Sequence, residues 1–397
     1  MQGLFIIPPH FGHVNASLKL VGELVRSGDN ILYICSDAFE EAVLTTGATF
    51  VAISELSPKE PPPPGKQDLF EMAFGTLCFT ERVVESILAK LKHYQIDYIV
   101  YDSICNYGHI ISLILDIPSV STLAIIPLPN EIAQQDKNMI DYDIVRRDNR
   151  YPTYELKQSE LSARWHIALP EINGLGFYYG KLNLVYTSRL FVRRPDKYNN
   201  TFKFIGVPTD GVGNTEVLIA ERSNQKIIYV SLGTTFNVSN KNLYTLFFDA
   251  LGDLDITVYM SAFEIDTTQL VGPDNFIIRE YLPQKEILRN AALAITNCGL
   301  NSTSEMILSG VPFISVPLSV DQPYLAKRYK DFGVTEIVDK NTLSSGEIRT
   351  LVLKMINDRK YYENAKALAY LLKRSDGICD GVEAIHNYVL ETRNGRG

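Results

Sequence analysis

The chain has 397 residues, of which 46% are hydrophobic and 21% charged, and its formal net charge at pH 7 is −8. This length suggests two domains of ordinary size, and the negative charge disfavours nucleic acid or an anionic membrane as a partner. The five cysteines are scattered and form no CxxC pair, and no run of about 18 apolar residues occurs. We therefore expect a cytoplasmic globular protein with no secretory signal and no transmembrane segment.

Short apolar strands alternate with helices in the first half of the chain. Strands are expected at 3–7, 30–35, 49–53, 98–101 and 118–122, and helices from Val14 to Gly28, at 39–45 and at 68–91. This alternation predicts right-handed βαβ units and a parallel sheet. Residues 58–65 include four consecutive prolines and are expected to form a surface loop. Residues 130–180 lack a clear period, so helices and loops are expected there.

The second half repeats the pattern. Strands at 182–186 and 202–206 are expected to complete the first domain, and 207–224, rich in Gly, Pro, Thr and Asn, is the best linker candidate. Further strands are expected at 226–230, 256–260, 275–278, 292–296, 313–316 and 334–338, and helices at 243–251, 345–356, 361–372 and 381–392. We predict two doubly wound α/β domains: an N-terminal domain at 1–207, a linker at 208–224, a second domain at 225–374 and a terminal helix within 375–397.

A polar turn at 297–303 follows the strand at 292–296 and precedes a helix that ends before Gly310. Free backbone N–H groups and small hydroxyls at a helix start can hold a phosphate. Glu305 lies one helical turn further on, where it could accept hydrogen bonds from ribose hydroxyls. Asp321 and Gln322 follow the next strand, at the sheet edge where ligands of open α/β sheets bind.

The stretch 281–322 carries a dense set of residues in fixed register: Tyr281, Pro283, Gln284, Cys298, Gly299, Asn301, Ser302, Glu305, Gly310, Val311, Pro312, Asp321 and Gln322. It resembles the donor-binding box of family 1 glycosyltransferases, the UDP-sugar-dependent transferases of plants and bacteria. The resemblance implies a GT-B fold, with two Rossmann-like domains facing a central cleft, the acceptor in the first domain and the nucleotide sugar in the second. It also implies a terminal helix that crosses back to the first domain. One position departs: Asn297 stands where the family has a histidine that contacts the donor diphosphate.

His13 is the candidate base, because it lies between the first strand and the first helix. The helix N-terminus disfavours imidazolium and keeps the ring able to accept a proton. Residues 9–15 also resemble the family's Gly-His-x-Asn-Pro turn, whose histidine is the base, with Ala16 in place of proline. Asp102 ends the strand at 98–101 and could hold the imidazole. The alternatives are a histidine that only packs against the turn, and an aspartate that caps the helix near 107–115. His10 is interpreted as a loop residue.

The remaining candidates would hold the donor. The diphosphate would be bound by Ser302, by the amides near Asn301 and Ser302, and by the turn that contains Ser231, Gly233 and Thr234. Gly299 is a further donor-binding candidate. Tyr281, with Leu282 beside it, would cover the nucleobase, Gln284 would bond the base or ribose, and Asp321 and Gln322 would bond the sugar. The simpler alternatives are an ordinary turn at Ser231, a buried core tyrosine at 281 and exposed helix capping at 321–322.

The predicted activity is an inverting, metal-independent transfer of a sugar from a UDP- or dTDP-sugar to a hydroxyl of a small, largely apolar natural product. Phe11, the region 70–79 and the segment 130–180 would line the acceptor side. Asp253 and Asp255 have the spacing of a metal-binding D-x-D motif, but they lie outside the donor-binding box and are interpreted as part of a solvated loop. No cofactor or metal is expected. A non-catalytic or decayed nucleotide-sugar-binding protein is the alternative suggested by Asn297, and a nucleotide-sugar epimerase of the same fold is a further one.

Overall fold

The computed structural model describes residues 1–57, 68–126, 142–170, 177–192, 194–208, 225–233, 241–262, 271–318, 321–374 and 377–395. The chain divides into two compact units. Unit 1 comprises Met1–Tyr186, Asp196–Gly211 and Gly377–Gly397, and unit 2 comprises Thr187–Pro195 and Val212–Asp376. The expected proline loop at 58–65, the expected linker apart from Pro208, and parts of 130–180 lie outside the described residues.

Unit 1 is built on a seven-stranded parallel sheet in the order β3-β2-β1-β4-β5-β6-β7. Its strands are β1 (Gln2–Ile6), β2 (Asn30–Cys35), β3 (Thr49–Ala52), β4 (Tyr98–Asp102), β5 (Ser119–Leu123), β6 (Leu182–Val185) and β7 (Phe202–Phe204). Its helices are α1 (Phe11–Arg26), α2 (Glu40–Leu44), α3 (Leu69–Leu91), α4 (Asn106–Leu115), α6 (Tyr142–Arg146), α7 (Tyr151–Trp165) and α14 (Ile378–Asn394). β1 and β4 are neighbours at the centre, so the segments that follow them meet at one edge of the sheet.

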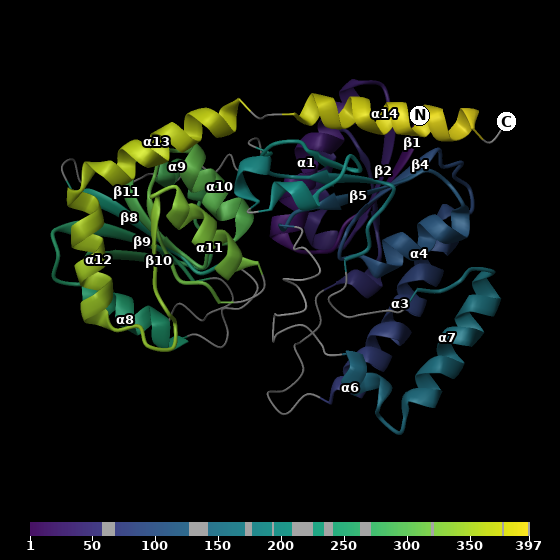
Figure 1. The fold of residues 1–397 in the computed structure, drawn as a ribbon, viewed down its shortest axis with the longest axis horizontal. Helices are drawn as coiled ribbons and strands as arrows, with labels where there is room; N and C mark the ends of the chain where they lie inside the picture. Colours follow the sequence, from purple (N-terminus) through teal and green to yellow (C-terminus); the bar gives the residue numbers. More distant parts are fainter. Residues whose placement is uncertain are drawn as a thin grey trace. The chain divides into compact units, whose positions relative to one another are not determined.

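Helices cover both faces of this sheet because its strands are apolar on both sides. Leu4 and Ile6 face a core shared with α3, α4 and α7, whereas Phe5 faces a core shared with α1 and α14. The two ends of the chain therefore meet, since α14 packs beside α1 (Figure 1). His386 of α14 contacts buried Asp29 at 3.0 Å between Nε2 and Oδ2, which fixes the helix to the unit.

Unit 2 has a six-stranded parallel sheet in the order β10-β9-β8-β11-β12-β13. Its strands are β8 (Lys226–Ser231), β9 (Ile256–Ser261), β10 (Phe276–Arg279), β11 (Ala291–Thr296), β12 (Phe313–Ser315) and β13 (Thr335–Ile337). Its helices are α8 (Lys241–Leu251), α9 (Gln284–Leu288), α10 (Leu300–Leu308), α11 (Gln322–Asp331), α12 (Ser345–Asn357) and α13 (Arg359–Lys373). Ile314 faces a core with α8 and α12, while Phe313 packs on Tyr329 of α11 on the other face, with ring centroids 5.4 Å apart.

The two doubly wound sheets confirm the predicted fold class. Two helix starts that position site residues differ from the prediction. α1 begins at Phe11 rather than Val14, because His10 takes the extended N-cap conformation and its carbonyl already accepts from His13 and Val14. α10 begins at Leu300 rather than Ser304, with Gly299 as its N-cap. His13, Asn301 and Ser302 therefore lie in first helical turns and not in the loops before them.

The described part of 130–180 consists of α6, α7 and non-helical segments without strands, as expected for that segment. Across the described ranges, we find no helix with the length and apolar character needed to cross a membrane.

Candidate active site

The candidate base and its carboxylate partner meet at the carboxyl edge of the unit 1 sheet. His13 lies in the first turn of α1 and Asp102 is the last residue of β4, and β1 and β4 pair in parallel with Ile6 opposite Tyr101. His13 Nδ1 lies 2.8 Å from Asp102 Oδ2, and the exposed fractions of the two side chains are 12% and 1%. The strand order thus brings together two residues that are 89 positions apart.

This contact settles the tautomer of His13 when Asp102 is ionised. A carboxylate can only accept, so Nδ1 carries the proton and donates it to Oδ2. Nε2 is then the basic nitrogen of the ring. The arrangement matches a base held and charge-stabilised by a buried aspartate.

The helix-capping alternative for Asp102 is wrong. The N-cap of α4 is Cys105, and no side chain makes a capping bond there. Asp102 Oδ1 instead accepts from the amide of Ile104 at 3.1 Å, in the turn before the helix. One carboxylate oxygen therefore holds the turn while the other holds His13.

Two further side chains lie beside the base. Phe11, two residues before His13, is 40% exposed and packs edge-on against Phe39 with ring centroids 5.1 Å apart. The ring of His10 is 6.0 Å from the ring of His13, centroid to centroid. The prediction treated His10 only as a loop residue. The His-x-x-His spacing at a helix start is the sequence signal that could have placed the two rings together.

In unit 2, two candidate donor turns lie side by side. Ser231 ends β8 and Thr296 ends β11, and these two residues are partners in the parallel ladder. Gly233 has φ +85°, and a Cβ at this position would lie 2.6 Å from Asn297 Nδ2. The buried Asn297 amide therefore rests directly on the Gly233 backbone. Thr234, the next residue of that turn, lies outside the described residues.

The turn after β11 leads directly into α10. Cys298 has φ +68°, a left-handed backbone conformation that residues other than glycine seldom adopt. Gly299 then caps the helix without a side chain, and Asn301 and Ser302 are half-buried in its first turn. The first backbone amides of a helix have no partner within the helix, so they can be donors for an anion.

Tyr281, Gln284 and Glu305 form a second group. Gln284 Nε2 donates to Glu305 Oε2 at 2.6 Å. Burial raises the pKa of Glu305, and the charge of Lys285 and the Gln284 bond oppose that rise. Tyr281 is 59% exposed, so the alternative of a buried core tyrosine is wrong. Leu282 is buried, so its side chain packs in the core and only its backbone could serve a ligand.

Asp321 and Gln322 lie at the start of α11 and are both buried. The alternative of exposed helix capping is therefore wrong, and the side chain of Asp321 makes no capping bond. Gln322 Oε1 accepts from the amide of Leu318 at 2.8 Å, across the loop after β12. That bond orients the Gln322 side chain with its oxygen towards the loop.

Asp253 and Asp255 are engaged in structural contacts. Arg349 pairs with both oxygens of Asp253, and Gln225 Nε2 donates to Asp255 Oδ1 at 2.5 Å. In the described ranges, no group of three His, Cys, Asp or Glu side chains is arranged to hold a metal ion.

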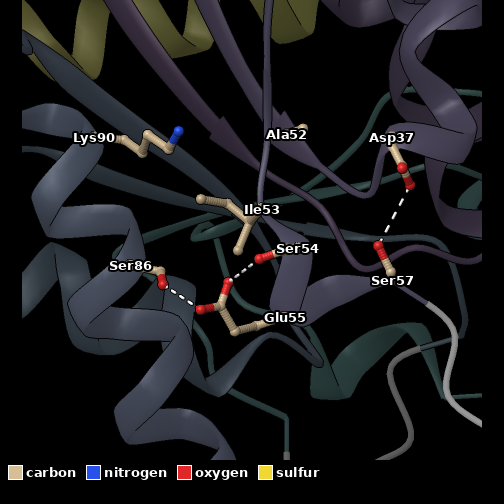
Figure 2. Close-up of a pocket in the computed structure, with 8 residues that line it drawn as sticks. All are labelled: Asp37, Ala52, Ile53, Ser54, Glu55, Ser57, Ser86 and Lys90. Atoms are coloured by element: carbon tan, nitrogen blue, oxygen red, sulfur yellow. Dashed lines mark hydrogen bonds between the residues drawn. The ribbon is translucent and has the colours of Figure 1, made fainter.

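A small pocket of about 250 Å³ lies elsewhere in unit 1 (Figure 2). Glu55 lines it and accepts hydrogen bonds from Ser86 at 2.5 Å and Ser54 at 3.1 Å, and Lys90 lies on the same helix as Ser86. None of the residues predicted for the site lines this pocket.

Comparison with known proteins identifies the class of protein to which this chain is similar. Residues 212–376 match the family "UDP-glucoronosyl and UDP-glucosyl transferase". The Bacillus subtilis protein named uncharacterized UDP-glucosyltransferase YojK is 26% identical over 95% of both chains. NDP-glycosyltransferase YjiC of the same organism is 26% identical over 93% of this chain and 92% of its own.

Solved structures agree on the fold. The glycotransferase of kitacinnamycin superposes with a TM-score of 0.81 at 20% identity, covering 98% of each chain. Glycosyltransferase VinC in complex with DTDP gives 0.70 at 15% identity, covering 98% of this chain and all of its own. The chain is a glycosyltransferase with the GT-B fold. The resemblance to family 1 glycosyltransferases is thereby confirmed.

Proposed function

We propose that the protein transfers a sugar, with inversion and without a metal ion, from a UDP- or dTDP-sugar to a hydroxyl of a small, largely apolar natural product. The observation that carries this proposal is the 2.8 Å contact between His13 and buried Asp102 at the carboxyl edge of the unit 1 sheet. Names that mention UDP-sugar chemistry among the relatives, and the DTDP complex of VinC, support the two donor nucleotides.

The proposed reaction is a single displacement. His13 Nε2 takes the proton of the acceptor hydroxyl as its oxygen bonds to C1 of the sugar, and the bond from C1 to the diphosphate oxygen breaks. The negative charge leaves with the nucleoside diphosphate. Asp102 stabilises the imidazolium that forms, and one displacement at C1 inverts its configuration.

Unit 2 would bind the donor. The Gly233 turn, the Asn297 amide and the first amides of α10 would hold the diphosphate. The bonded pair of Gln284 and Glu305 would face the ribose, and exposed Tyr281 has an aromatic face for the base. Asp321 and Gln322 would bond the sugar hydroxyls.

Exposed Phe11 beside the base supports an apolar acceptor. The absence of a metal from the proposed mechanism is supported by the contacts that engage Asp253 and Asp255. Location in the cytoplasm is part of the proposal and rests on the five cysteines, all of which are free thiols.

The test is nucleotide release from UDP- and dTDP-sugars, with and without a panel of aromatic and macrolide alcohols. NMR of the product reports the configuration at C1. We expect acceptor-dependent release, inversion, and full activity after exhaustive treatment with EDTA. Retention at C1, or a strict need for Mg²⁺ or Mn²⁺, would contradict the mechanism. UDP binding without release for any acceptor would favour the non-catalytic alternative.

A further inference from the structure

His10 is held by its backbone at the edge where the candidate base lies. It is the N-cap of α1, and its carbonyl accepts from the amides of His13 at 2.9 Å and Val14 at 3.0 Å. Its side chain makes no capping hydrogen bond and is exposed. The helix therefore does not depend on the imidazole, which lies beside the base and has no part in the proposed mechanism.

The two rings are arranged to contact one molecule. Their centroids are 6.0 Å apart and their planes are tilted by 58°. A hydrogen bond from nitrogen to oxygen spans about 2.9 Å. Each ring can therefore bond a different oxygen of the same small ligand when those oxygens are close neighbours.

His10 is suited to bind a neutral hydroxyl or carbonyl. Desolvation by the surrounding residues and then repulsion from His13 lower the pKa of His10 below the ordinary histidine value, and attraction from Asp102 opposes that shift. This shift favours the neutral form of the ring. A neutral imidazole has one donor and one acceptor nitrogen, so it can pair with either kind of oxygen.

We propose that His10 is a specificity-determining residue that binds a second oxygen of the acceptor, next to the hydroxyl that receives the sugar. The preferred acceptors then carry two neighbouring oxygens, as in a catechol, a vicinal diol or a hydroxyl beside a carbonyl. This inference rests on the proposed function, in which His13 deprotonates the first hydroxyl. Phe11, which lies between His10 and His13 in the sequence, is exposed and would supply apolar contact to the same acceptor.

The test uses two coumarins, umbelliferone and esculetin, which differ by one hydroxyl adjacent to the reacting one. Three variants are compared: His10→Phe keeps a ring without hydrogen bonding, His10→Gln keeps a donor and an acceptor, and His93→Phe is the matched control. His93 is also exposed, but it precedes β4 and so lies towards the opposite edge of the sheet from Asp102.

We expect His10→Phe to raise KM for esculetin about fivefold with kcat unchanged, the factor that corresponds to one hydrogen bond of ~1 kcal/mol. Umbelliferone kinetics should not change. His10→Gln should recover most of the loss, and His93→Phe should behave as wild type with both acceptors. Calorimetric titration of esculetin should show the same fivefold loss and needs no turnover.

An equal rise in KM for both acceptors in His10→Phe would show a structural role for His10 and overturn the inference. No rise in KM for either acceptor would also overturn it. Suppose that wild type transfers sugar to neither coumarin while His10→Phe still weakens esculetin binding selectively. In that case the role of His10 is supported, and the proposed transfer to acceptors of this kind is refuted. If transfer occurs and selectivity is unchanged, only the inference falls.

Discussion

Replacing Asp102 by asparagine tests the mechanism most directly. The change keeps the shape of the side chain and removes the charge that faces His13 Nδ1 at 2.8 Å. The charge centres of an imidazolium and this carboxylate are roughly 4 Å apart, where two unit charges interact by about 4 kcal/mol at an effective dielectric constant of 20. Each 1.36 kcal/mol changes a rate about tenfold. Asp102→Asn should therefore lower kcat by about 10³.

The assay is steady-state release of nucleotide at saturating acceptor, together with calorimetry of UDP binding. UDP affinity should not change, because every candidate donor residue that the structure describes belongs to unit 2. Asp97→Asn is a matched control at the other end of β4, where the carboxylate accepts from the amide of Gln2 at 2.7 Å. It should leave kcat within twofold of wild type.

A kcat for Asp102→Asn within tenfold of wild type would refute the reasoning, because the buried carboxylate would then not stabilise the charge that forms on His13. Equal losses in the Asp102 and Asp97 variants would refute it too, since both substitutions would then act through the stability of the sheet as a whole.

Three further outcomes are expected. Asn297→His should tighten UDP binding about fivefold, which is the gain of a charge-assisted over a neutral hydrogen bond. Calorimetry of UDP binding measures the effect. If Asn297→Ala binds UDP as tightly as wild type does, this side chain does not contact phosphate. Gly233→Ala should lower the free energy of unfolding of unit 2 in urea, because φ there is +85° and the new Cβ would lie 2.6 Å from Asn297 Nδ2. The loss of unfolding free energy should be smaller in an Asn297→Ala background. Strictly additive losses in the double variant would contradict the contact between the two residues. Tyr98→Phe should cost about 2 kcal/mol of unfolding free energy at pH 7, because Tyr98 donates to buried Asp29 at 2.7 Å.

The Tyr98 effect has a defined pH window. Burial raises the pKa of Asp29, but hydrogen bonds from Tyr98, the chain's first amine and His386 outweigh it and lower the pKa overall. The stabilisation is therefore complete above the ordinary aspartate pKa of about 3.9 and is lost as the pH falls through the lowered value. Chemical denaturation of wild type and Tyr98→Phe should converge below that range. A difference that stays constant down to pH 2, or so, would contradict this account.

Much of the candidate site could be predicted because its residues follow strands. The donor box is nearly contiguous, and local apolar runs indicate where its strands end. Asp102 could be paired with His13 because the carboxyl ends of neighbouring parallel strands share an edge. The environments of individual side chains were harder to predict from the sequence. The exposure of Tyr281 and the burial of Asp321 and Gln322 depend on which faces other helices cover.

The sequence by itself determined the alternation of strands and helices and the identity of the donor box, since both depend on periodicity and spacing within a few turns of chain. Only the tertiary structure decided that the Asn297 amide rests on Gly233, that Gln284 bonds Glu305, and that His10 lies beside His13. Local propensity acts over a turn or two of chain, whereas contacts between loops follow from strand order, ladder register and the points at which α1 and α10 begin. Those features are set by the packing of the whole sheet.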